Sequence, residues 1–458
     1  MTSNNWITKE FGANHVAPFV MVLIISALSG RHLFMDGANF VVQLALDPFW
    51  YPDGQQTPRR LFAVAWATAP ARLIGFLLPS QIRITSLLFG VATYSELALP
   101  LIVTINSKLD GVTKSTIVIL FVSATCFLAN IPVSELVFAL GLTTIFVVYA
   151  LDPAQDPKRH YRLVIGLLLM ASYEVVALSN IVLAIGTCIS ARYERGTRKK
   201  NYALAGILSL ALPFQIICRY PEPITPGEGV FRGFTFAICG IFVATLLLGA
   251  ISFKLIGASN VLRASAIFVS FAIPLTLLLM PDLIGIRTRA FQYAYPSRIY
   301  SAGVTLVIAA FPVILNRDLI LWPSRMLDWF GERPLRDLSF AMLAGFCGVS
   351  LLAISDAYFY RVRLDDELAQ LSGFVSTESC AFCLEPTKFG LPNLSYPGIM
   401  PVYSMAHTLK HPELPPVIVF SQDDIGRYVS REQMEVFMSH QLVARRKKDD
   451  GHVPSSTR

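Results

Sequence analysis

Long apolar runs recur along most of the chain, and short polar or charged segments separate them. A helix that crosses the roughly 30 Å hydrocarbon core of a bilayer needs about 20 mostly apolar residues, and the runs have about this length. They are too continuous for the alternating pattern of a membrane β-strand. The pattern therefore predicts an all-α polytopic membrane protein with about eleven transmembrane helices. The predicted spans are residues 16–30, 61–79, 84–105, 115–130, 133–151, 163–190, 202–219, 233–253, 263–280, 299–315 and 338–355.

The same pattern divides the chain into a transmembrane bundle and a small C-terminal domain. The bundle covers residues 1–355, and the domain, which has Pro-rich loops and a soluble composition, covers residues 356–445. Within the domain the sequence predicts a strand at Val417–Phe420 and a helix at 431–442. Residues 446–458 are polar and charged, and we predict that this tail is disordered.

Two connecting segments, residues 31–60 and 317–336, mix apolar, aromatic and charged residues, which is typical of helices that lie at a membrane surface. The basic loop from Arg192 to Lys200 is predicted to be cytoplasmic by the positive-inside rule. Because six predicted spans precede this loop, the N-terminus is also predicted to be cytoplasmic, with the outer loop 31–60 and the C-terminal domain extracytoplasmic. We expect an integral protein of a bacterial inner membrane.

Composition agrees with a membrane protein and offers little support for a soluble enzyme. Hydrophobic residues make up 54% of the chain and charged residues 15%, whereas soluble domains have roughly 25% charged residues. The net charge is +7, but the basic residues are scattered through short loops, so anionic lipids or phosphates are expected as partners and nucleic acid is not. The chain has no P-loop, dinucleotide-binding, nucleophile-elbow or H-E-x-x-H motif. Cys380 and Cys383 form one C-x-x-C, which fits a disulfide, two free thiols, or a metal or redox site.

Charged side chains inside predicted spans are candidates for function, because a charge in hydrocarbon is costly unless it is paired or hydrated. Glu96, Glu174 and Arg72 occupy such positions. They either hold helices together, are solvated in a polar cavity, or contact a substrate. We select Glu174 as the candidate substrate-binding residue among them.

The outer loop after the first span holds the candidate catalytic carboxylate. Asp36 follows this span closely and lies beside Arg31 and His32. A carboxylate there is suited to act as a general base toward an acceptor hydroxyl, or to hold a divalent cation. Guanidinium groups at head-group depth are suited to bind phosphate, although the same groups also contact ordinary anionic lipids. The candidate phosphate-binding residues are Arg59, Arg60, Arg287, Arg289 and Arg298.

This layout resembles the GT-C class of membrane glycosyltransferases, which place an acidic residue in the first extracytoplasmic loop. Asp36 stands at the matching position, and the interfacial segment, the basic entry to the second span and the C-terminal module also correspond. Many members have a second acid in this loop, which here is Asp47 or Asp53. The resemblance implies sugar transfer from a polyprenyl-phosphate donor to a lipid or glycan acceptor on the outer face. Asp36 would then be the base, and the outer arginines would hold the donor phosphate.

Two other classes of protein fit the same pattern. A transporter or flippase for an amphipathic substrate would line a path near the bilayer midplane with Glu96, Glu174 and Arg72, and would have a cavity that opens to alternating sides. A non-enzymatic membrane subunit would use the C-terminal domain to recruit a partner and would show neither turnover nor transport.

Overall fold

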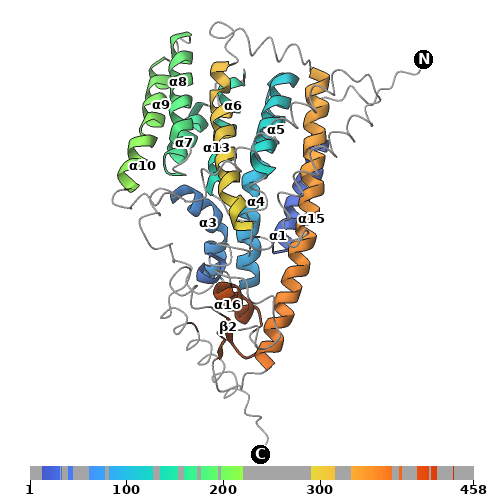
Figure 1. The fold of residues 1–458 in the computed structure, drawn as a ribbon. Coiled ribbons are helices and arrows are strands. Elements are labelled where there is room, and N and C mark those ends of the chain that lie inside the picture. Colours follow the sequence, from blue (N-terminus) through green and yellow to red (C-terminus); the bar gives the residue numbers. More distant parts are fainter. Residues whose placement is uncertain are drawn as a thin grey trace, which may run out of the picture. The chain divides into compact units, whose positions relative to one another are not determined.

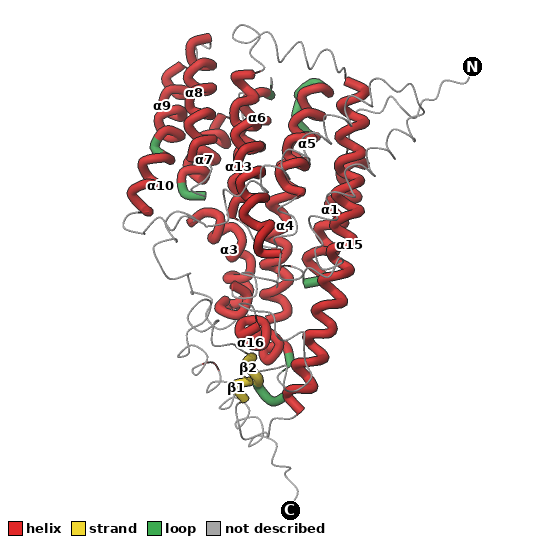
Figure 2. The backbone as a smooth tube through the Cα atoms, in the orientation of Figure 1, coloured by secondary structure: helices red, strands yellow, loops and turns green. Residues whose placement is uncertain are grey.

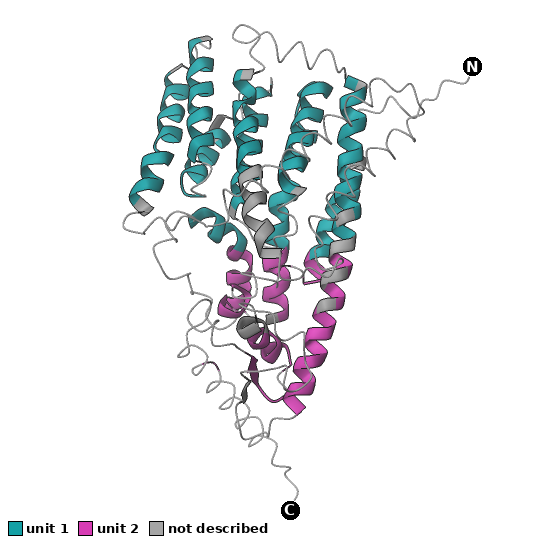
Figure 3. Cartoon of the chain, viewed as in Figure 1, with its two compact units in different colours: residues 1–26, 51–67, 91–353 teal, residues 27–50, 68–90, 354–458 magenta. Residues whose placement is uncertain are grey.

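The computed structural model is mostly helical, which confirms the all-α class at this coarse level (Figure 2). It separates into two compact units (Figure 3). Unit 1 comprises Met1–Ser26, Tyr51–Ala67 and Val91–Ala353, and unit 2 comprises Ala27–Trp50, Thr68–Gly90 and Ile354–Arg458. The structure describes residues 13–30, 32, 40–44, 61–77, 82–126, 135–152, 159–172, 177–193, 198–219, 290–314, 332–373, 381–383, 400–411, 414–419 and 437.

Unit 1 is a bundle of helices that run alongside one another (Figure 1). The helices that lie wholly within it are α5 (Gly111–Cys126), α6 (Glu135–Leu151), α7 (Arg159–Met170), α8 (Ala177–Tyr193), α9 (Arg198–Ser209), α10 (Ala211–Arg219) and α13 (Ala290–Ile314). Helix α13 packs against α5, α6 and α8, and α8 packs along α9. The helices that contribute residues to both units are α1 (Ala13–Leu28), α3 (Leu61–Leu77), α4 (Ile82–Ile105) and α15 (Glu332–Gly373).

Close packing in unit 1 depends on a small residue and on hydroxyl groups that find partners within the helices. A Cβ atom added to Gly141 of α6 would lie 2.9 Å from the carbonyl oxygen of the buried Glu96 on α4, so only glycine permits this approach. The hydroxyl of Thr104 donates to the Pro100 carbonyl one turn earlier, at 2.7 Å. These bonds allow polar side chains to be buried without water, as helices in a bilayer require.

The prediction of a single span at residues 163–190 is wrong, because the structure has two helices there, α7 and α8. The carbonyl groups at the end of α7 are satisfied by buried side chains of other helices. Asn180 Nδ2 donates to the Leu169 carbonyl at 3.2 Å, and Gln215 Nε2 donates to the Met170 carbonyl at 2.9 Å. Since the last carbonyls of a helix need partners outside it, these amides stabilise an ending that the apolar sequence conceals.

Helix α15 also differs from the prediction, because it does not end near residue 355 but continues to Gly373. Its 42 residues correspond to a length of about 63 Å, roughly twice the thickness of a bilayer core. The extension repeats apolar residues at helical spacing, and Leu364, Leu368 and Leu371 are all buried. The C-terminal region predicted to be a soluble domain therefore begins as a continuous helix.

The number of membrane spans is not confirmed. In the described residues two helical stretches, Arg83–Ile105 and Lys199–Ile217, are long and apolar enough to cross a membrane by length and composition. Shorter apolar helices occupy α1, α3, α5, α6, α7, α8 and α13. The predicted spans 233–253 and 263–280, and most of the predicted interfacial segment 317–336, lie outside the described residues.

Unit 2 contains a small parallel sheet with a helix packed on it. Strand β1 (Ala381–Cys383) pairs in parallel with β2 (Val417–Val419), with Phe382 opposite Ile418. The predicted strand at Val417–Phe420 is thus confirmed, whereas Cys380 and the predicted helix at 431–442, apart from residue 437, lie outside the described residues. Helix α16 (Met400–Lys410) is attached to β2 through hydroxyls, because the Val419 N–H donates to Ser404 Oγ at 3.1 Å.

Candidate anion-binding pocket

Most of the residues selected from the sequence lie where the structure describes nothing. Asp36, Asp47, Asp53, Arg59, Arg60, Glu174, Arg287 and Arg289 lie outside the described residues. Arg298 belongs to α13, but its side chain is not described. Arg72 donates from Nε to Thr68 Oγ1 of its own helix at 2.9 Å, and Glu96 is buried on α4. The roles proposed for these residues stay predictions.

Unit 2 instead contains a polar pocket of about 270 Å³. Four segments that are distant in sequence form its lining: the end of α1, the first turns of α4, the C-terminal part of α15 and the end of α16. The lining residues are Ala27, Leu28, Gly30, Arg83, Ser86, Leu87, Arg361, Asp365, Lys410 and His411.

Helical spacing explains how each segment presents its polar residues to the pocket. Arg83 and Ser86 are three residues apart on α4, and Arg361 and Asp365 are four apart on α15, so each pair shares one helix face. Gly30 closes the end of α1 with φ of 73°, a left-handed conformation suited to glycine, and its N–H donates to the Ala27 carbonyl at 3.2 Å.

Both arginines are anchored by main-chain carbonyl groups at helix ends. Arg83 Nη2 donates to the Lys410 carbonyl at 3.3 Å, and Arg361 Nη1 donates to the Ser29 carbonyl. The Arg361 guanidinium also lies 5.5 Å from the centre of the Tyr358 ring, which favours a cation. These contacts hold the side chains in place without neutralising their charge.

The pocket carries an excess of positive charge. Arg83, Arg361 and Lys410 face it together with one carboxylate, Asp365, so the formal balance of these four groups is two positive charges. The pKa of the Lys410 ammonium is lowered to about 8, mainly by burial; Asp365 opposes this shift, and Arg361 and Arg83 add to it. The ammonium is therefore destabilised by its surroundings, and an anion in the pocket would relieve this.

His32 forms the buried wall behind Ser86. Its Nε2 atom lies 3.0 Å from Ser86 Oγ, and its side chain is almost completely buried. Burial, together with Lys410 and Arg361, lowers the pKa of His32 to about 3 although Ser86 opposes the shift, so the ring is neutral at physiological pH. The ring packs against the α4 backbone at Gly90, where an added Cβ would lie 2.4 Å from Nδ1.

Asp365 connects the pocket with a second histidine. His407 Nδ1 lies 3.2 Å from Asp365 Oδ1, and the His407 ring is 4.6 Å from that of His411. Among the described lining residues Asp365 is the only carboxylate, and this contact holds it on the side of α16. The arrangement is suited to bind an anion through guanidinium, ammonium and hydroxyl donors.

Sequence reasoning missed most of this pocket. His32 was noted only as a neighbour of Asp36, and Arg83, Arg361 and Lys410 were not selected. One signal was available in the sequence: Arg83 lies in the first turn of an apolar helix, a position at which a charged side chain can reach the membrane surface.

No protein-family model, curated protein or solved structure matches this chain. The fold and the pocket define it only at the level of class, as a mostly helical protein with a cationic pocket.

Proposed function

We propose that the protein is an integral membrane glycosyltransferase that holds the phosphate of a polyprenyl-phosphate sugar donor in the unit 2 pocket. The observation that carries the proposal is the convergence of Arg83, Arg361 and Lys410 on one cavity at the ends of two apolar helices, α1 and α4. Guanidinium and ammonium groups are the usual protein donors to phosphate oxygens.

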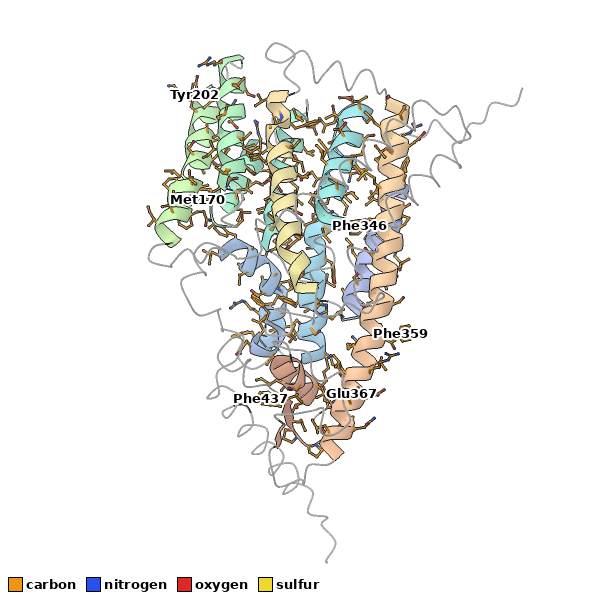
Figure 4. All side chains as sticks on the ribbon, viewed as in Figure 1. Met170, Tyr202, Phe346, Phe359, Glu367 and Phe437 are labelled. Atoms are coloured by element: carbon orange, nitrogen blue, oxygen red, sulfur yellow. The ribbon has the colours of Figure 1, made fainter. Side chains whose placement is uncertain are left out.

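The outer surface of unit 1 supports placement in a membrane. Helices α7 to α10 expose many large apolar side chains, and clustered exposed apolar side chains are typical of surfaces that contact lipid or another protein. Tyr202 of α9, labelled in Figure 4, is one of them. The others on these helices are Tyr161, Leu163, Val164, Leu167, Leu178, Ile185, Ile216 and Ile217, with Leu210 between α9 and α10. A lipid environment would cover this surface, with the N-terminus in the cytoplasm and the pocket on the opposite side of a bacterial inner membrane.

The pocket has the size and lining expected for the head group of such a lipid. Its volume of about 270 Å³ is at or below the lower end of small-molecule sites, so it suits a phosphate with part of an attached sugar but not a long isoprenoid chain. Ala27, Leu28 and Leu87 add an apolar side to the lining. The chain of the donor would remain in the bilayer while its phosphate is held by the cations.

The reaction breaks the bond between the anomeric carbon and the phosphate oxygen and forms a bond from that carbon to the acceptor oxygen. The acceptor proton passes to a base, for which Asp36 is the candidate, and the bond electrons leave with the phosphate. Fixed cations stabilise the charge that develops on the departing phosphate, usually the largest contribution to such catalysis.

The test measures transfer of labelled sugar from a polyprenyl-phosphate sugar to lipid acceptors by the purified protein in nanodiscs. Arg83→Gln and Arg361→Gln are compared with Arg363→Gln, which removes the same charge from an exposed position on α15. We expect the first two variants to lose most activity and the third to keep it. Absence of transfer by the wild-type protein, together with uptake of a lipid-linked substrate into liposomes, would instead establish a transporter.

A further inference from the structure

We infer that the unit 2 pocket selects a phosphate monoester dianion over a phosphodiester monoanion, an inference that rests on the phosphate-binding role proposed above. In a reaction that releases phosphate from a sugar, the donor is the diester and the leaving lipid phosphate is the monoester. The pocket would therefore bind the leaving group more tightly than the donor.

The first argument is charge balance. Among the described lining residues, Arg83, Arg361 and Lys410 exceed the carboxylate of Asp365 by two formal charges, which one dianion compensates and a monoanion only half compensates. Neither arginine has its charge cancelled by its anchoring contact, because each is held by a carbonyl oxygen, Lys410 O or Ser29 O. The two guanidinium groups are therefore held in place by neutral carbonyl groups, and their positive charge remains available to a ligand.

The second argument is the supply of donors. Lys410 has three N–H donors, and each guanidinium has N–H groups beyond the one that contacts a carbonyl. Ser86 adds a hydroxyl, and the neutral His32 at 3.0 Å can donate from Nε2 to Ser86 Oγ, which leaves the Ser86 proton for the ligand. A monoester offers three non-bridging oxygens to these donors, and a diester offers two.

The third argument is burial. Lys410 is half-buried beside Arg361, and burial is the main cause that lowers its pKa to about 8, with Asp365 opposing the shift. In such surroundings a further negative charge on the ligand is worth more than at an open surface, because the effective dielectric constant is lower. The groups that face Lys410 are Arg83 on α4, Arg361 and Asp365 on α15, and His32 after α1.

The selectivity has a consequence for the reaction. As the sugar leaves, the charge on the phosphate grows from one to two, so a pocket matched to the dianion stabilises the transition state more than the bound donor. It also retains the lipid monophosphate after transfer. A reaction that consumes this product, by re-esterifying or hydrolysing the phosphate, must therefore follow for turnover to continue.

The test compares two probes with the same alkyl chain, dodecyl phosphate and methyl dodecyl phosphate, binding to the full-length protein in neutral phosphatidylcholine nanodiscs. Their apolar parts are nearly alike, and the difference in partition that their charges cause is measured with empty nanodiscs and subtracted from both affinities. At pH 7.5 we expect the monoester to bind roughly tenfold more tightly or better. Inorganic phosphate is the third probe, and binding comparable to that of the monoester would show that the pocket takes free phosphate and not a lipid head group.

Variants and pH supply the controls. The preference for the monoester should shrink toward unity in Lys410→Gln and in Arg361→Gln and should persist in Arg363→Gln. In the wild-type protein it should also shrink as pH falls below about 6, where a monoester loses its second charge. Equal affinities of the two alkyl probes at pH 7.5 would overturn the inference while leaving phosphate binding intact. Binding of neither probe would overturn the proposed function as well.

Discussion

Replacing Gly90 by alanine should damage the wall of the pocket in a way that the structure quantifies. The new Cβ would lie 2.4 Å from His32 Nδ1 and 2.5 Å from Cε1, closer than real Cβ contacts. The α4 backbone is held by its own helix, so the His32 ring must move. This movement separates His32 Nε2 from Ser86 Oγ, which now lie 3.0 Å apart in a buried site.

The magnitude follows from three contributions. Loss of the buried hydrogen bond between His32 and Ser86 costs about 1–3 kcal/mol, because the separated groups cannot reach water. Crowding of a packed site costs about 1–3 kcal/mol more. Alanine has a higher helix propensity than glycine, which raises the free energy of unfolding by up to about 1 kcal/mol and offsets part of this loss. We therefore expect Gly90→Ala to lower the free energy of unfolding by about 1–6 kcal/mol, with a central value of ~3.5 kcal/mol.

The assay is denaturant titration of the detergent-solubilised protein, with Gly206→Ala as the matched control. Gly206 lies in helix α9, and an added Cβ there meets nothing within 4 Å, so the control should be neutral or slightly stabilising. In a His32→Ala background the ring is absent, and the effect of Gly90→Ala should disappear. If Gly90→Ala is as stable as Gly206→Ala in the wild-type background, the packing of His32 against α4 is refuted.

Two further predictions concern Lys410 and the end of α7. The pKa of Lys410 is about 8 in the folded protein, against the ordinary lysine value of 10.5 expected in the unfolded chain. Between these values the unfolded state holds more protons, so the free energy of unfolding should rise with pH. Denaturant titrations from pH 7 to 10 should show this rise, and Lys410→Met should remove it; identical curves would contradict the buried ammonium. Asn180→Leu removes the 3.2 Å donor to the Leu169 carbonyl, and because Ser172 Oγ still donates to this carbonyl at 3.1 Å, the loss should cost about 0.5–1.5 kcal/mol. An unchanged unfolding midpoint would show that this amide does not stabilise the helix end.

The apolar pattern located helices well where each run ended in charges or turn-forming residues. Helices α1, α3, α4, α5 and α6 coincide within a few residues with the first five predicted spans. The pattern failed at α7 and α8, because the break between them has no Pro or Gly and only one charged residue, Glu174, between long apolar runs. The amides that satisfy the end of α7 come from Asn180 and from the distant Gln215, and nothing near residue 170 indicates them.

The pocket was hidden for a related reason. Its cations come from segments far apart in the chain, and Arg83 contacts the carbonyl of Lys410 across 327 positions. Beyond residue 355 the change to a soluble composition suggested a separate small domain, although Leu364, Leu368 and Leu371 keep a helical spacing that continues α15. Local propensity and periodicity identify elements, whereas a cluster of charges depends on contacts that only the folded chain defines.

The anchoring of Arg83 and Arg361 by carbonyl oxygens has a kinetic consequence. If carboxylates held these side chains, the negative and positive charges would cancel each other at a distance. Because neutral carbonyl groups hold them, both guanidinium groups attract approaching anions over a long range. The association rate of an anionic amphiphile should therefore fall steeply as ionic strength increases, because the screening length shortens to about 8 Å near physiological salt. Capture of the ligand would then be governed by the salt concentration at the membrane surface as well as by the fit of the pocket.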